Sequence, residues 1–229
     1  MNRAIIAAAG RGSRFGRPGG KQFADLLGVP LIAYAIEAVE KSSSVGEIVI
    51  VAGDDDIVIC REFIANSSFK KVVKVVTGGK RRQDSVYIGL REMPADTEKV
   101  IIHDGARPLI TVAAIEKAIS ASGDHGGILA VPVTDTIKFC DDYGFVLSTR
   151  ERAGLWAAQT PQVFPFRALL RAYSQALESG IEATDDAAVF EASGGIVKVI
   201  TGDYENIKVT TEIDLKLAGV ILSERIVTR

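Results

Sequence analysis

Short apolar runs alternate with segments of helical periodicity along most of this chain. Each run is rich in apolar residues and is followed within two positions by Gly or Asp, which is typical of a buried strand that ends at a turn. The predicted strands span residues 5–9, 47–51, 71–76, 99–103, 127–133 and 196–200. Runs of this length are too short for helices of ordinary size, so we interpret them as strands of one sheet.

Apolar residues at helical spacing fill most of the intervals between these strands. They predict helices over 31–39, 85–90, 112–121, 167–177 and 185–192, and a last helix near the end of the chain. Thr111 is a candidate N-cap, and Thr211 and Asp214 have the spacing of a capping box. Strands that alternate with helices favour a Rossmann-like α/β fold, with a mostly parallel sheet and helices on both faces.

Residues 134–160 interrupt this alternation. Two β-rich runs, 136–139 and 145–148, flank the turn sequence Asp141-Asp142-Tyr143-Gly144 and predict a β-hairpin. A hairpin is not a regular part of a doubly wound sheet, and two roles are open: a lid, or an arm that pairs with a second subunit. We expect a single domain over residues 1–229 that carries this hairpin as an insertion.

Composition and charge narrow the class of protein. The chain has 229 residues, of which 47% are hydrophobic, enough for a substantial core. A net charge of −2 gives no general attraction to nucleic acid or to an anionic membrane. Cys60 and Cys140 are too few for a zinc site and are expected as free thiols. Since the sequence shows neither a membrane-spanning stretch nor a signal-peptide pattern, we expect a cytoplasmic protein.

The first strand opens into a glycine-rich loop that contains cations and no acid. Small residues let a polyanion approach the backbone, whose N–H groups can hold phosphate. A Walker A loop needs Ser or Thr after its lysine, whereas Gln22 follows Lys21; a dinucleotide fingerprint needs its third glycine one position before Gly16. The loop therefore predicts a phosphate site of another kind, with the cations Arg11, Arg14, Arg17 and Lys21.

Polar residues follow the other predicted strands, and ligands of open α/β sheets bind at these strand ends. Asp104 lies between His103 and Arg107 and is a candidate Mg²⁺ neighbour; the alternative is a helix cap or an ion pair with Arg107. We expect His103 to be a half-buried structural residue. Ser85 has two interpretations, a helix-start residue or a hydroxyl that contacts a base. Lys208 is expected in a short strand.

Eight ordered motifs join these groups between about residues 4 and 218. They are Ala8-Ala9-Gly10-x-Gly12-x-Arg14, Lys21-Gln22, Gly78-Gly79-x-x-Arg82-x-x-Ser85-Val86, His103-Asp104-x-Ala106-Arg107-Pro108, Asp135-Thr136-x-Lys138, Leu155-Trp156-x-Ala158-Gln159-Thr160-Pro161-Gln162, Thr184-Asp185 and Asn206-Ile207-Lys208-Val209-Thr210. In this order they resemble the 2-C-methyl-D-erythritol 4-phosphate cytidylyltransferases of the non-mevalonate isoprenoid pathway. The resemblance implies a fold of the nucleotide-diphospho-sugar transferase type. It also implies transfer of CMP from CTP to 2-C-methyl-D-erythritol 4-phosphate, which gives 4-diphosphocytidyl-2-C-methyl-D-erythritol and pyrophosphate.

The resemblance also implies roles for single residues. Arg14 and Lys21 would stabilise the pentavalent transition state and the departing pyrophosphate, and Lys208 would face the α-phosphate of CTP. CTP would be held by Ala8, Ala9, Gly10, Gly79, Arg82, Ser85, Asp104 and Ala106, with Asp104 serving the Mg²⁺–triphosphate. The polyol phosphate would be held by Arg107, Thr136, Arg152, Thr160 and Thr184. Thr136 and the catalytic Arg152 would come from the arm of a neighbouring subunit, so the resemblance implies a homodimer.

Three other functions compete with this one. A ribitol-5-phosphate or related polyol-phosphate cytidylyltransferase would share the fold and the chemistry, but the motif around Trp156 favours the methylerythritol enzyme. An NAD-dependent oxidoreductase is disfavoured by the failed dinucleotide fingerprint. A non-catalytic nucleotide sensor would not need Lys21, Asp104 and Lys208 together.

Overall fold

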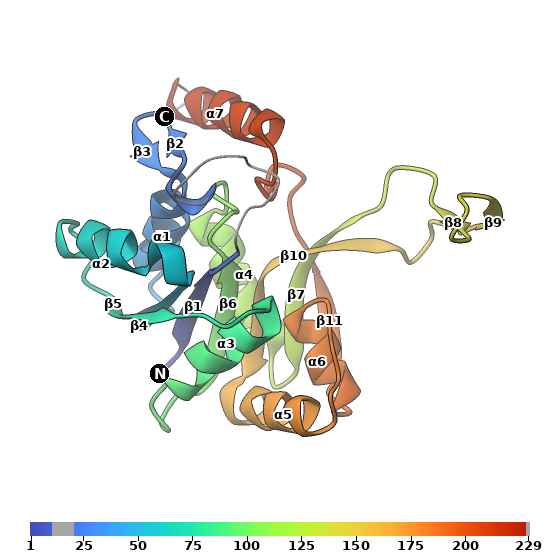
Figure 1. Ribbon diagram of the computed structural model, residues 1–229, viewed down its shortest axis with the longest axis horizontal. Coiled ribbons are helices and arrows are strands. Elements are labelled where there is room, and N and C mark those ends of the chain that lie inside the picture. The colour runs from blue at the N-terminus through green and yellow to red at the C-terminus, as the bar shows by residue number, and fades with distance from the viewer. Residues whose placement is uncertain (11–20, 228–229) are drawn as a thin grey trace.

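A central sheet organises the chain. The computed structural model describes residues 1–10 and 21–227, and within them seven strands form one sheet in the order β11-β7-β10-β6-β1-β4-β5 (Figure 1). These strands are β1 (Arg3–Ala8), β4 (Glu47–Ala52), β5 (Val72–Thr77), β6 (Lys99–Asp104), β7 (Gly126–Pro132), β10 (Trp156–Pro165) and β11 (Val197–Thr201). Strand β10 runs antiparallel to β6 and β7, and the other pairs are parallel. The predicted mostly parallel sheet is therefore confirmed.

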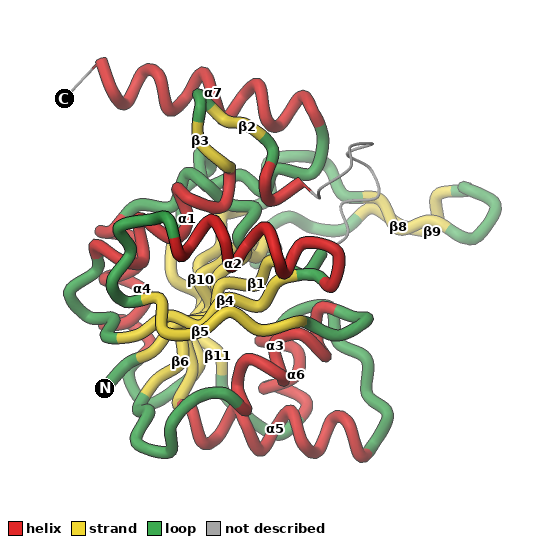
Figure 2. The backbone as a smooth tube through the Cα atoms, turned by 60° about the vertical axis from the view of Figure 1, so that its left-hand side comes forward, coloured by secondary structure: helices red, strands yellow, loops and turns green. Residues whose placement is uncertain are grey.

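Helices cover both faces of the sheet, as predicted. They are α1 (Leu31–Lys41), α2 (Ile57–Ala65), α3 (Arg82–Arg91), α4 (Val112–Ser122), α5 (Phe166–Glu178), α6 (Asp186–Ala192) and α7 (Glu212–Val227). Buried residues of α1, α2 and α4 share one hydrophobic cluster with the sheet, and those of α3, α5 and α6 share another. Figure 2 shows α1 and α2 on one side of the strands and α3, α5 and α6 on the other.

A smaller layer lies beside the sheet near α7. It contains the turn η1 (Lys21–Phe23), which leads into the short hairpin β2 (Asp25–Leu26) and β3 (Val29–Pro30). The other short turn, η2 (Asp54–Asp56), lies between β4 and α2 instead. A third cluster joins this hairpin to α7 through Leu26, Val209 and Ala218. The predicted capping box of α7 is confirmed, because Thr211 N–H donates to Asp214 Oδ2 at 2.8 Å and Asp214 N–H donates to Thr211 Oγ1 at 3.3 Å.

The predicted hairpin projects from the body of the protein as an arm (Figure 1). Strands β8 (Lys138–Cys140) and β9 (Val146–Thr149) pair antiparallel, and Asp141 Oδ1 accepts hydrogen bonds from the N–H groups of Tyr143 and Phe145. The arm extends sideways instead of folding over the carboxyl ends of the strands. The hairpin therefore does not lie where a closed lid would, and its pairing with a second subunit stays a prediction.

Among the longer elements, β10 and α2 were not predicted from the sequence. In β10 the apolar pattern is broken by buried polar residues and by Pro161, and the register shifts between Ala158 and Gln162. In α2, Val58 and Ile59 are 61% and 44% exposed, so the apolar positions do not follow the buried face of the helix. In the described part of the chain, none of the helices is long and apolar enough to span a membrane.

We expect the Ile102→Ala substitution in β6 to lower the free energy of unfolding by about 2–5 kcal/mol, because it leaves a cavity beneath the strand that carries Asp104. Ile102 is fully buried, whereas Val73 of β5 is 55% exposed, so Val73→Ala is the matched control. Urea unfolding of both variants measures the difference. Equal losses in the two variants would contradict this description of the core.

Candidate functional site

Asp104 lies at the centre of the candidate site. It ends β6, next to the end of β1, where the register pairs it with Ala7. Its side chain is 9% exposed; Oδ1 accepts a hydrogen bond from Arg82 Nε at 3.1 Å, and Oδ2 lies 2.7 Å from Lys208 Nζ. Burial raises the pKa of Asp104, but the charges of Arg82 and Lys208 outweigh burial and hold the pKa well below its usual range. The carboxylate is therefore ionised, and the alternative pairing with Arg107 is not the one that forms.

Arg82 joins Asp104 to a second buried carboxylate. It is the first residue of α3, and its Nη1 and Nη2 atoms donate to Asp186 Oδ1 and Oδ2 at 3.0 and 2.7 Å. Asp186 is the first residue of α6 and is fully buried. The structure thus brings together Arg82, Asp104 and Lys208, three predicted site residues that are far apart in the sequence.

Lys208 lies in an irregular segment, so the short strand expected there is wrong. Single hydrogen bonds, and not the regular ladder of a β-strand, hold this segment. Val209 N–H donates to Ala106 O at 2.8 Å, and Arg107 Nη1 donates to Asn206 O at 2.6 Å. Asn206 Nδ2 donates in turn to Thr160 O at 2.9 Å. Ala106 and Arg107 therefore fix the position of the segment that carries Lys208.

The Gly78-Gly79 loop lies against the end of the first strand. A Cβ atom at Gly78 would lie 2.5 Å from Ala9 Cβ, and one at Gly79 would lie 2.5 Å from Asp84 Cβ, so neither position has room for a side chain. Ser85 Oγ accepts from Gly79 N–H at 3.1 Å and donates to Arg81 O at 3.0 Å. Ser85 is a buried residue of the first turn of α3, and its hydroxyl shapes this loop.

His103 and Thr160 form a hydrogen-bonded chain behind Asp104. The expectation that His103 is half-buried is wrong, because it is fully buried, and burial lowers its pKa to about 4. Since Arg107 O can only accept, His103 Nε2 carries the proton toward it at 3.2 Å. His103 Nδ1 then accepts from the Thr160 hydroxyl at 3.0 Å, and Thr160 Oγ1 accepts from Asp104 N–H at 3.0 Å. These bonds hold the backbone of Asp104 in place.

Comparison with known proteins now adds to this geometry. Residues 3–224 match the model of the family described as 2-C-methyl-D-erythritol 4-phosphate cytidylyltransferase. The chain belongs to this family. A cytidylyltransferase of this name from Desulforamulus reducens is 46% identical over 224 residues, which cover 97% of this chain and 96% of the relative. One from Pelotomaculum thermopropionicum is 42% identical over 97% of this chain and 94% of the relative.

Solved structures agree with the family assignment. The crystal structure of 4-diphosphocytidyl-2C-methyl-D-erythritol synthase from Anaerococcus prevotii superposes with a TM-score of 0.85 and 30% identity, covering 97% of this chain and 98% of the other. The family's structure from Francisella tularensis gives a TM-score of 0.81 and 27% identity, covering 96% of this chain and 99% of the other. The predicted fold type is therefore confirmed over nearly the whole chain.

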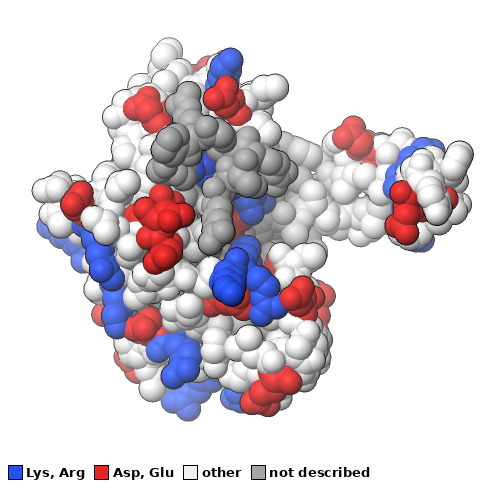
Figure 3. Space-filling view, viewed as in Figure 1, with Lys and Arg blue, Asp and Glu red and all other residues white. Residues whose placement is uncertain are grey.

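The remaining predicted site residues lie on several different elements of the fold. Ala8 ends β1 and is buried, and Gly10 is exposed just beyond it. Thr184 is exposed before α6, and Thr136 and Arg152 are exposed at the base of the arm. Figure 3 shows Lys and Arg side chains gathered near the centre of the face that it draws. Lys21 begins η1, whereas Arg14 lies outside the described residues.

Asp186 and Tyr173 are the residues of this site that sequence reasoning missed. The Thr184-Asp185 motif ends one residue before Asp186, but the sequence gives no sign of which acidic residue faces inward. Asp185 caps α6 by accepting from Ala188 N–H at 2.9 Å, while Asp186 accepts from Arg82. Only the orientation of α6 separates the two roles.

We expect Thr160→Val to lower the free energy of unfolding by about 1–3 kcal/mol, because His103 Nδ1 and Asp104 N–H would lose their buried partner. Thr160→Ser keeps the hydroxyl and should lose less. Denaturant unfolding of the two variants measures the contrast. If Ser were as destabilising as Val, the hydroxyl would not be the stabilising group.

Proposed function

We propose that this chain transfers CMP from CTP to 2-C-methyl-D-erythritol 4-phosphate at the site around Asp104. The products are 4-diphosphocytidyl-2-C-methyl-D-erythritol and pyrophosphate. The observation that supports this site best is the meeting of Arg82, Asp104 and Lys208 beside the Gly78-Gly79 loop, in a chain of the cytidylyltransferase family. In the reaction, a phosphate oxygen of the acceptor attacks the α-phosphorus of CTP, and the bond to pyrophosphate breaks. No nucleophile of the protein is needed, so the protein positions the reactants and neutralises charge.

The cytidine end of CTP is assigned to the loops beside β1 and α3. The resemblance to the family supports this assignment, and so does the close packing of the Gly78-Gly79 loop against Ala9 at the end of the first strand. The hydroxyl of Ser85 already bonds to the backbone of Gly79 and Arg81, so we propose that it holds the loop in shape for the base. The full CTP set consists of Ala8, Ala9, Gly10, Gly79, Arg82, Ser85, Asp104 and Ala106.

The triphosphate is assigned to the cations around Asp104. Lys208 now pairs with Asp104 Oδ2, and the arriving triphosphate offers Lys208 a stronger anionic partner. Lys21 and Arg14 are proposed to stabilise the pentavalent transition state and the leaving pyrophosphate. Each preorganised cation of this kind contributes about 2.7–4 kcal/mol to transition-state stabilisation.

Asp104 is the proposed protein ligand of Mg²⁺. Among the described residues, no group of three or more His, Cys, Asp or Glu side chains could form a metal site by itself. The ionised carboxylate of Asp104 fits the other arrangement, in which one carboxylate binds Mg²⁺ together with phosphate oxygens and water. When bound, Mg²⁺ would neutralise charge on the triphosphate.

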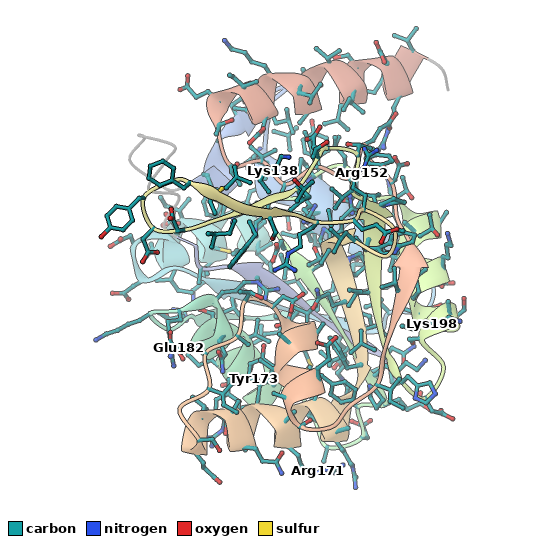
Figure 4. The ribbon with its side chains drawn as sticks, turned by 90° about the vertical axis from the view of Figure 1, so that its right-hand side faces the viewer. Lys138, Arg152, Arg171, Tyr173, Glu182 and Lys198 are labelled. Carbon is teal, nitrogen blue, oxygen red and sulfur yellow. The ribbon has the colours of Figure 1, made fainter. Side chains whose placement is uncertain are left out.

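The acceptor is assigned to Arg107 and Thr184, together with Thr136 and Arg152 from the arm of a second subunit. Thr160 belongs to the same set but is buried, so it contributes by holding the backbone of Asp104. The surface of the arm supports pairing with another copy, since Phe139, Phe145 and Leu147 are 52%, 72% and 60% exposed. Arg152 lies toward the arm in Figure 4, away from Tyr173. The homodimer, the single domain over residues 1–229 and the cytoplasmic location all remain predictions.

We expect Lys21→Ala and Lys208→Ala each to lower kcat by about 10²–10³-fold, because a cation that faces transition-state charge is removed. Pyrophosphate release in the presence of CTP, Mg²⁺ and 2-C-methyl-D-erythritol 4-phosphate measures the effect. Lys216→Ala is the matched control, since Lys216 is exposed on α7 and outside the proposed site. Wild-type turnover in either site variant would show that the substituted lysine has no part in the mechanism. If the wild-type protein used ribitol 5-phosphate but not 2-C-methyl-D-erythritol 4-phosphate, the assigned acceptor would be wrong.

We expect Arg152→Ala to raise the KM for the acceptor while leaving the KM for CTP unchanged, whereas Arg171→Ala, also exposed, should change neither. Mixing Arg152→Ala with Lys208→Ala subunits tests the arm. The assay uses an acceptor concentration so low that Arg152→Ala alone turns over negligibly. If arms cross, random C2 pairing then restores about a quarter of wild-type activity, because half of the dimers contain one intact site. A mixture no more active than its parts would show that Arg152 serves its own subunit.

A further inference from the structure

Two buried carboxylates hold the Arg82 side chain from opposite ends. Nη1 and Nη2 form a bidentate pair with Asp186, and Nε donates to Asp104 Oδ1. A bidentate contact fixes the plane of a guanidinium group as well as its distance. Arg82 therefore reaches Asp104 with an orientation that the Asp186 carboxylate sets.

Asp186 is itself held from behind by Tyr173. Tyr173 Oη donates to Asp186 Oδ1 at 2.5 Å, and both residues are fully buried. The Tyr173 ring stacks on Tyr87 with centroids 6.2 Å apart and planes 7° apart. Burial and the neighbouring carboxylate raise the pKa of Tyr173, so its hydroxyl remains a donor. The support for Asp186 is thus a packed aromatic side chain with little freedom to move.

The segment just before Asp186, residues 181–185, is held by hydrogen bonds of its own. Gln83 Oε1 accepts from Ala183 N–H at 3.1 Å, and Gln83 Nε2 donates to Ile181 O at 3.0 Å. Asp185 also keeps its cap on α6 and accepts from Gln162 Nε2 at 2.8 Å. Because these bonds do not involve the Asp186 carboxylate, the segment should stay in place when that carboxylate is changed.

We propose that Asp186, supported by Tyr173, is a positioning residue for Arg82. It holds the guanidinium so that Arg82 occupies Asp104 Oδ1 and leaves Oδ2 to Lys208. This inference rests on the proposed function, in which Arg82 binds CTP. It gives Asp186 and Tyr173 a part in CTP binding although neither touches CTP.

The first test is Asp186→Asn. The amide has the same shape, but its NH₂ group would face the N–H donors of Arg82, and one of the two bonds would be lost. A misplacement of about 1 Å costs on the order of 100-fold in rate, so we expect kcat/KM for CTP to fall by that order while the KM for the acceptor stays unchanged. Calorimetric titration with CTP alone should show weaker binding. Tyr173→Phe keeps the ring and should give a fall of a few-fold in the same direction.

A double-mutant cycle separates positioning from a structural role. If Asp186 acts through Arg82, the Arg82→Ala/Asp186→Asn variant will be no less active than Arg82→Ala alone, and Tyr173→Phe will likewise add nothing. If the activity losses of the two single variants multiply in the double variant, the proposal is wrong. Should Asp186→Asn fail to fold, the cycle of Tyr173→Phe with Arg82→Ala decides by the same criterion.

Glu182→Gln is the matched control. It makes the same acid-to-amide change in the same segment, but Glu182, which is labelled in Figure 4, is exposed. Its carboxylate pairs with Arg81. Its kinetics and CTP affinity should equal those of the wild type. An inactive wild type would refute the proposed function, whereas an active wild type with an unaffected Asp186→Asn variant would refute this inference alone.

Discussion

The ionised carboxylate of Asp104, buried at the end of a central strand, is the constraint on which the site depends. Removing a carboxylate from water costs several kcal/mol unless partner charges compensate. Here the partners are Arg82 from the start of α3 and Lys208 from the segment before α7, each bonded to a different oxygen. These two segments therefore have to reach the end of β6 in the folded state. The same requirement brings together the side chains that a triphosphate needs.

The buried charges next to Asp104 are compensated by partners of their own. Arg82 needs a second anion, which Asp186 supplies, and Asp186 accepts a further bond from Tyr173. On the other side, the bonds from Thr160 to His103 and from Arg107 to Asn206 hold the backbone around Asp104 and Lys208. These bonds satisfy buried polar groups, so they fix the positions of the site residues closely.

The arm, unlike the body of the protein, has no buried core of its own. Its strands pair only with each other, and its large apolar side chains remain in water within one chain. A two-stranded hairpin is marginally stable in isolation, so contact with a second copy would stabilise it and bury its apolar surface. The proposed sharing of Arg152 between subunits gives this arrangement a chemical use, because each acceptor site would then require two chains.

The sequence by itself determined the strands that end in the site, most of the helices, the hairpin and the residues of the eight motifs, because apolar periodicity and turn residues are local signals. It did not reveal β10, where Gln159, Thr160 and Gln162 are buried by hydrogen bonding despite their polarity. Nor did it reveal α2, whose outward side chains include Val58 and Ile59. Only the tertiary structure decided that Lys208 lies in an irregular segment, that Asp104 pairs with Arg82 instead of Arg107, and that Asp186 faces inward while Asp185 caps a helix. Those choices depend on which charges meet after the chain has folded, and no local pattern of residues carries that information.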